Sequence, residues 1–88
     1  MRIRRNHELG VDEARKRADQ LAGVLKEQYS LTSSWRGDYM IVTGNGVDGH
    51  LLVEAESIEM VIKLGFALKL MEGPIRSFIE KSIDQYLV

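Results

Sequence analysis

The sequence contains no cysteine. Disulfide bonds, thiolate metal ligands and a cysteine nucleophile are therefore excluded, and packing alone must stabilise the fold, as suits a reducing compartment. No segment approaches the ~18 consecutive apolar residues that a membrane-spanning helix requires. Charged residues follow the N-terminus, where a signal peptide would need an apolar stretch. We therefore expect a cytoplasmic protein with no membrane span.

An excess of positive charge is also missing. Twelve Lys and Arg residues are balanced by thirteen Asp and Glu residues, which gives a formal net charge of −1. Proteins that bind nucleic acids generally concentrate positive charge to neutralise phosphates. Here basic residues cluster at Arg2, Arg4 and Arg5, which we interpret as the solvated edge of a first strand. The sequence predicts no nucleic-acid partner.

The length of 88 residues, with a hydrophobic fraction of 44% and a charged fraction of 28%, is typical of one globular domain. We assign residues 1–88 to that domain. A chain of this size can build one compact core but has little room for a deep internal cavity.

Hydrophobic periodicity predicts the element order β-α-β-β-β-β-α. The first strand is expected within residues 1–8, and an amphipathic helix over residues 11–29. Turn signals at Gly37-Asp38 and at Asn45-Gly46 separate the strands that follow. Those strands are expected at residues 31–35, 39–43, 47–54 and 58–64. Gly73-Pro74 should open the last helix, with proline at the first helical position.

Both long helices carry one apolar stripe, and the strands between them are apolar on one face. The stripes comprise Ala14, Ala18, Leu21, Ala22, Leu25 and Tyr29 in the first helix, and Ile75, Phe78, Ile79, Ser82, Ile83 and Tyr86 in the last. These patterns predict an α+β fold in which the two amphipathic helices pack on one face of a curved antiparallel sheet. Strands two to five should form a meander, with strand one at one of its edges. This order resembles a reduced helix-grip architecture, whose larger members hold lipids or other hydrophobic ligands; the analogy concerns the fold alone.

No catalytic or metal-binding constellation is visible. His7 and His50 have no ligand neighbours at helical or hairpin spacing, and Glu54, Glu56 and Glu59 fall in or just after a turn, where carboxylates are normally solvated. The glycines at 44–46 lead into a strand, whereas a phosphate-binding loop should open a helix. We expect no enzymatic activity, no cofactor and no metal.

Five large apolar side chains are candidate contacts for a partner or an apolar surface: Trp35, Phe66, Leu68, Leu70 and Met71. The simplest interpretation of Trp35, at a strand end, is a lid on the core; the alternative is a binding platform. The other four lie in segment 66–71, between the last strand and the last helix. This segment either closes the open end of the core, with an extra turn of helix, or forms an exposed apolar patch.

The chain resembles the polyhydroxyalkanoic acid system family along nearly its whole length. The residues that carry the resemblance are His7-Glu8-Leu9, Asp12-Glu13-Ala14-Arg15, Trp35-Arg36-Gly37-Asp38, Gly46-Val47-Asp48-Gly49 and Leu64-Gly65-Phe66. The resemblance implies a small bacterial protein encoded near genes that make or mobilise polyhydroxyalkanoate storage polyesters, without a defined active site. The run Tyr39-Met40-Ile41-Val42 departs from the family pattern by being more apolar than expected.

Two functional hypotheses follow. In the first, the chain is a non-enzymatic accessory protein of polyester storage metabolism that contacts the granule surface or a granule-associated protein. In the second, it is a binding module that holds an apolar ligand between the C-terminal helix and the sheet. The first hypothesis predicts an exposed apolar patch, whereas the second predicts a cavity of at least about 300 Å³.

The open meander also predicts a homodimer. Residues 39–42 carry no charge and would be poorly protected at a sheet edge. The dimer is expected to bury Phe66, Leu68 or Leu70, or to continue the sheet across a two-fold axis.

Overall fold

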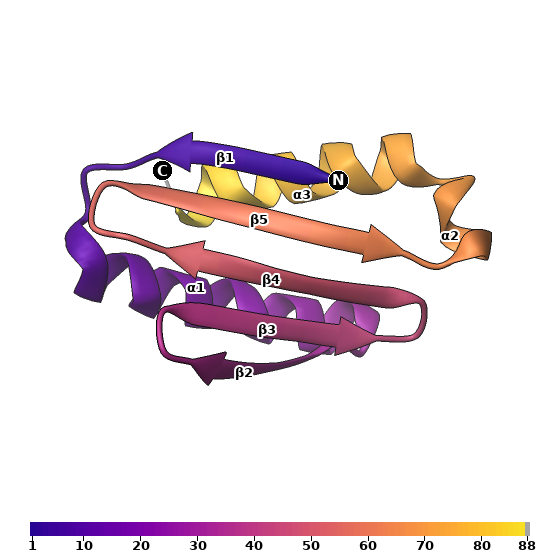
Figure 1. The fold of residues 1–88 in the computed structure, drawn as a ribbon, viewed down its shortest axis with the longest axis horizontal. Helices are drawn as coiled ribbons and strands as arrows, with labels where there is room; N and C mark the ends of the chain where they lie inside the picture. Colours follow the sequence, from indigo (N-terminus) through magenta and orange to yellow (C-terminus); the bar gives the residue numbers. More distant parts are fainter. Residues whose placement is uncertain (88) are drawn as a thin grey trace.

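The computed structural model describes residues 1–87 and contains one five-stranded antiparallel sheet and three helices (Figure 1). The strand order is β1-β5-β4-β3-β2, and neighbouring strands are antiparallel. The elements, in chain order, are β1 (Arg2–Asn6), α1 (Gly10–Tyr29), β2 (Thr32–Arg36), β3 (Tyr39–Gly44), β4 (Val47–Val53), β5 (Ser57–Leu64), α2 (Phe66–Lys69) and α3 (Glu72–Tyr86).

The strand order confirms the predicted meander, with β1 added at one edge beside β5. It also corrects one expectation. The uncharged residues 39–42 belong to β3, which is paired on one side with β2 and on the other with β4. The second edge of the sheet is therefore β2, and residues 39–42 do not form an edge through which two copies could associate.

Helix α1 buries the small and large residues of its stripe: Ala14, Ala18, Leu21, Ala22 and Leu25. The alanines allow the helix to lie close to the sheet, because they place little volume between the two layers. The helix is capped at its C-terminus by Ser30, which adopts the left-handed conformation (φ 57°). The amide of Ser30 donates to the carbonyl of Lys26, and the amide of Leu31 donates to the carbonyl of Leu25. Tyr29, predicted within the apolar stripe, is 51% exposed because it is the last residue of α1.

Helix α3 begins at Glu72, earlier than the predicted opening at residues 73 and 74. Pro74 is thus the third helical residue, where its missing N–H still falls among the amides that have no intrahelical partner. Ile83 and Leu87 are fully buried. The predicted core residue Ile79 is only half-buried, since it lines an open groove beside α1.

The core lies between the sheet and the helices, with α1 and α3 both on the same face of the sheet (Figure 1). The inward residues of the two longest strands are buried: Leu51 and Val53 in β4, and Ile58, Met60, Ile62 and Leu64 in β5. The predicted α+β architecture and element order are therefore confirmed.

Candidate functional site

The segment that joins β5 to α3 is fixed onto the turn between β3 and β4. The amide of Gly65 donates to the carbonyl of Gly46 at 2.7 Å, and the amides of Leu68 and Lys69 fold back to the carbonyl of Gly65. The Leu68 side chain lies against Gly46, where an added Cβ would come within 3.1 Å of its Cδ1 atom. These contacts hold α2 as one short turn of helix with Leu68 facing the domain.

The other large side chains of this segment face outward. Phe66 is 88% exposed, Leu70 is 86% exposed and Met71 is 54% exposed. Phe66 and Leu70 are four residues apart and so project from the same side, opposite Leu68. We call Phe66, Leu70 and Met71 the apolar end. Of the two sequence interpretations, core closure thus describes Leu68 alone, and an exposed apolar patch describes the other three residues.

An apolar groove of about 280 Å³ runs between α1 and α3 and shares Met71 with the apolar end. Its lining comprises Leu25, Tyr29, Leu31, Met71, Pro74, Ile75, Phe78 and Ile79. The ring of Tyr29 meets that of Phe78 edge to face at a centroid distance of 5.0 Å, which joins the two helices across the groove. The groove and the apolar end therefore form one continuous apolar surface at this end of the molecule.

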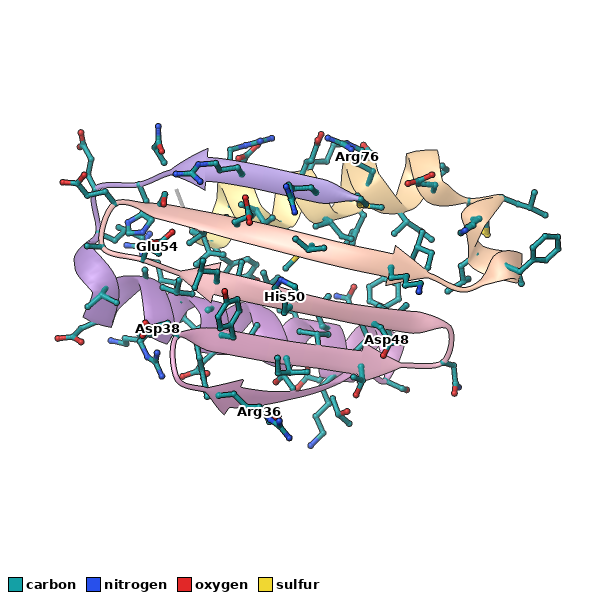
Figure 2. The ribbon with its side chains drawn as sticks, in the orientation of Figure 1. Arg36, Asp38, Asp48, His50, Glu54 and Arg76 are labelled. Carbon is teal, nitrogen blue, oxygen red and sulfur yellow. The ribbon has the colours of Figure 1, made fainter. Side chains whose placement is uncertain are left out.

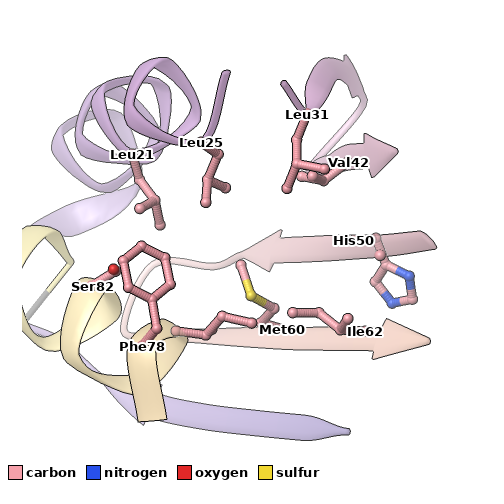
Figure 3. Close-up of a pocket in the computed structure, with 11 residues that line it drawn as sticks. Leu21, Leu25, Leu31, Val42, His50, Met60, Ile62, Phe78 and Ser82 are labelled. Carbon is pink, nitrogen blue, oxygen red and sulfur yellow. The ribbon is translucent and has the colours of Figure 1, made fainter. Parts of the chain in front are cut away.

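A smaller apolar pocket of about 30 Å³ adjoins the groove (Figure 3). Leu25, Leu31, Phe78 and Ile79 line both spaces, while Met60 and Ile62 of β5 contribute to the inner wall of the smaller one. Its volume is small, with room for about one or two water molecules. This agrees with the limited cavity volume expected for a chain of this size.

Trp35 lies on the edge strand β2 and is not brought together with the apolar end, which follows β5 across the sheet (Figure 1). Its Nε1–H donates to Asp19 Oδ1 at 2.7 Å, and the Arg15 guanidinium lies 4.0 Å from the ring centroid. Arg15 also donates to the carbonyl of Gly37. The indole is thus held half-buried under α1, as the lid interpretation predicts.

Chemistry-bearing side chains do not converge in the part of the chain that the structure describes. Asp48, His50 and Glu54 are spread along the length of the sheet (Figure 2). Among residues 1–87, no group of three or more His, Asp or Glu side chains could hold a metal ion. No helix in the same range is both long and apolar enough to cross a membrane.

His7 is buried and links two loops at one end of the sheet. Its Nδ1 accepts from the amide of Leu9 at 3.1 Å, so its Nε2 carries the hydrogen that is donated to the carbonyl of Glu54 at 2.9 Å. Both ring nitrogens are therefore occupied by structural hydrogen bonds.

We predict that His7→Ala lowers the free energy of unfolding by about 2 kcal/mol, because it leaves a partly buried amide and a carbonyl without their partner. The matched control is His50→Ala on β4, whose ring contacts Tyr39 edge to face and makes no comparable pair of hydrogen bonds. Urea unfolding of both variants measures the difference. Equal losses in the two variants would contradict the structural role of His7.

Sequence reasoning missed part of this surface. The helical spacing predicts Ile75, Phe78 and Ile79 in the buried stripe of the last helix, yet they line the groove. Pro74 also lines the groove, although the sequence indicates only its role at the start of the helix. The stripe has the ordinary width of a core-facing helix, so its spacing does not distinguish a covered residue from one that lines a groove.

Comparison with known proteins places these observations in a family. Neither the curated proteins nor the solved structures include a significant match to this chain. The family model described as "Putative polyhydroxyalkanoic acid system protein (PHA_gran_rgn)" matches residues 1–87. The chain therefore belongs to the polyhydroxyalkanoic acid system protein family, as its sequence motifs predicted.

Proposed function

We propose that this chain is a non-enzymatic accessory protein of polyhydroxyalkanoate metabolism that contacts the surface of the cytoplasmic storage polyester through its apolar end. Membership of the family supports the link to polyhydroxyalkanoate metabolism. The exposure of Phe66, Leu70 and Met71 on one short segment supports the proposed contact with the polyester surface.

The physical chemistry of the segment supports adsorption to an apolar surface. Burial of a fully exposed Phe or Leu side chain contributes about 1.5–3 kcal/mol. Lys69 lies between Phe66 and Leu70 and can extend its ammonium group toward water while its methylenes follow the apolar surface. The hydrogen bond between Gly65 and Gly46 fixes the backbone of this segment before contact, so adsorption does not have to order it.

The test is equilibrium adsorption of the purified chain to protein-free polyhydroxyalkanoate particles, with native granules in parallel. Adsorption to the bare polyester supports the proposal. Adsorption to native granules but not to the bare polyester would show that the partner is a granule-associated protein. That result would overturn the proposed contact with the polyester surface.

The apolar groove favours a second candidate function, the binding of an aliphatic ligand between α1 and α3. Its volume of about 280 Å³ is close to the lower limit of typical ligand sites, and its lining is apolar. We predict that a fluorescent fatty acid binds with one-to-one stoichiometry and that Ile75→Arg weakens binding about tenfold by placing a charge in the groove. A titration that does not saturate, or one that Ile75→Arg leaves unchanged, would exclude this function.

A further inference from the structure

The two edges of the sheet differ in their protection against pairing with another chain. The edge strand β1 carries Arg2, Arg4 and Arg5, so two copies of this edge would repel each other. The opposite edge, β2, has the sequence Thr-Ser-Ser-Trp-Arg, with neither charge nor proline before its last residue. By the usual rules of edge protection, β2 is the edge left open.

The hydrogen-bond pattern identifies which groups of β2 point away from the sheet. The amide of Val53 on β4 donates to the carbonyl of Asp38, so Met40 and Val42 also direct their peptide groups toward β4. The alternate residues Tyr39 and Ile41 of β3 consequently pair with β2.

Their partners in the β2–β3 register are Arg36 and Ser34. Ser33 and Trp35 therefore direct their N–H and C=O groups outward from the edge. Two residues of β2 thus present four backbone hydrogen-bonding groups to whatever lies beside this strand.

We propose that a second copy of this chain pairs with β2 in antiparallel orientation, with the two-fold axis at Ser34. In this register Ser33 of each copy exchanges two hydrogen bonds with Trp35 of the other copy, and all four outward groups are satisfied. The two Ser34 side chains then face each other on the side of the sheet away from the helices. The result is a continuous ten-stranded sheet.

Neighbouring registers use fewer of these groups. Centring the axis on Ser33 would pair Trp35 with Leu31, whose amide already donates to the carbonyl of Leu25 at 3.3 Å. Centring it on Trp35 would pair Ser33 with Gly37, whose carbonyl already accepts from Arg15 at 2.9 Å. The register centred on Ser34 uses neither of these occupied groups.

A second copy fits this edge because the outward groups of β2 are arranged symmetrically about Ser34. Residues on both sides of the axis present the same pair of donors and acceptors, and the side chains at the centre are small and uncharged. Arg36 would lie opposite Thr32 of the other copy, so the interface brings no like charges together. This inference goes beyond the polyester contact, because the pairing leaves the apolar end uncovered.

Charge substitution at Ser34 tests this pairing by sedimentation equilibrium. The wild-type chain should sediment at twice the monomer mass. Ser34→Glu and Ser34→Lys should each raise the dissociation constant of the dimer about tenfold or more, because each variant opposes two like charges. An equimolar mixture of the two variants should associate again.

The matched control is Ser77→Glu, which adds the same charge at an exposed position of α3. It should leave the dimer unchanged. Amide hydrogen exchange gives an independent reading: the amides of Ser33 and Trp35 should be protected in the wild type and exchange rapidly in Ser34→Glu. A monomeric wild type, or single variants that remain dimeric, or a mixture that does not reassociate would overturn the proposal.

Discussion

Replacement of Ile83 by alanine is expected to lower the free energy of unfolding by about 2–5 kcal/mol. Ile83 is fully buried in α3, so the substitution removes three carbon atoms from a close-packed site. Ile83 belongs to the single core cluster of the domain, whose close packing limits how far the cavity can collapse. Urea unfolding followed by circular dichroism measures this loss.

The matched control is Ile79→Ala, the same chemical change one helical turn earlier. Ile79 is half-buried and lines the groove, so its truncation enlarges an open space rather than creating a closed cavity. We expect less than half of the loss seen for Ile83. A loss below about 1 kcal/mol for Ile83→Ala, or equal losses for the two variants, would contradict the described docking of α3.

The sequence was sufficient to predict the order of the elements and the faces that they bury. Alternation in β5 identifies Ile58, Met60, Ile62 and Leu64 as the inward residues, and all four are buried. The alanines of α1 similarly mark its contact with the sheet. These patterns are local, because the periodicity of a strand or helix determines which side chains share a face.

The sequence could not predict how completely neighbours cover an apolar face. Ile79 and Tyr29 belong to apolar stripes but line the groove between α1 and α3, so both remain partly accessible. The sequence also left open which end of the predicted meander pairs with the first strand, and therefore which strand forms the second edge. Strand order depends on pairing between distant segments, and the polar sequence of β2 gives little indication that it ends the sheet.

For the candidate site, the sequence identified segment 66–71 but left its exposure open. The hydrogen bond between Gly65 and Gly46 determines which side chains of segment 66–71 face the domain, and these two glycines are far apart in the chain. Leu68 turns inward because of this contact, and Phe66 and Leu70 turn outward. No local pattern encodes such a choice.

The double variant Phe66→Ser with Leu70→Ser is expected to weaken adsorption to the polyester about a hundredfold. The two side chains would together contribute about 3 kcal/mol or more when they leave water, which corresponds to a factor of about 100 in the binding constant. Their exposed fractions of 88% and 86% mean that few contacts within the fold are lost. The free energy of unfolding should therefore change by less than about 0.5 kcal/mol per substitution.

A second double variant, Val11→Ser with Tyr39→Ser, provides the control. It removes two apolar side chains that are also exposed, at 37% and 42%, but lie on α1 and β3 away from the apolar end. If adsorption depended only on the total exposed apolar surface, both double variants would adsorb more weakly than the wild type. If adsorption occurs through the apolar end, only the Phe66/Leu70 variant adsorbs more weakly.

The most direct measurement is the adsorption isotherm of the wild-type chain and of these two double variants on protein-free polyhydroxyalkanoate particles. We predict saturable adsorption of the wild type and of the Val11/Tyr39 variant, with the Phe66/Leu70 variant about a hundredfold weaker while equally folded. Equal adsorption of all three proteins, or a wild-type chain that stays in solution, would contradict the proposed contact.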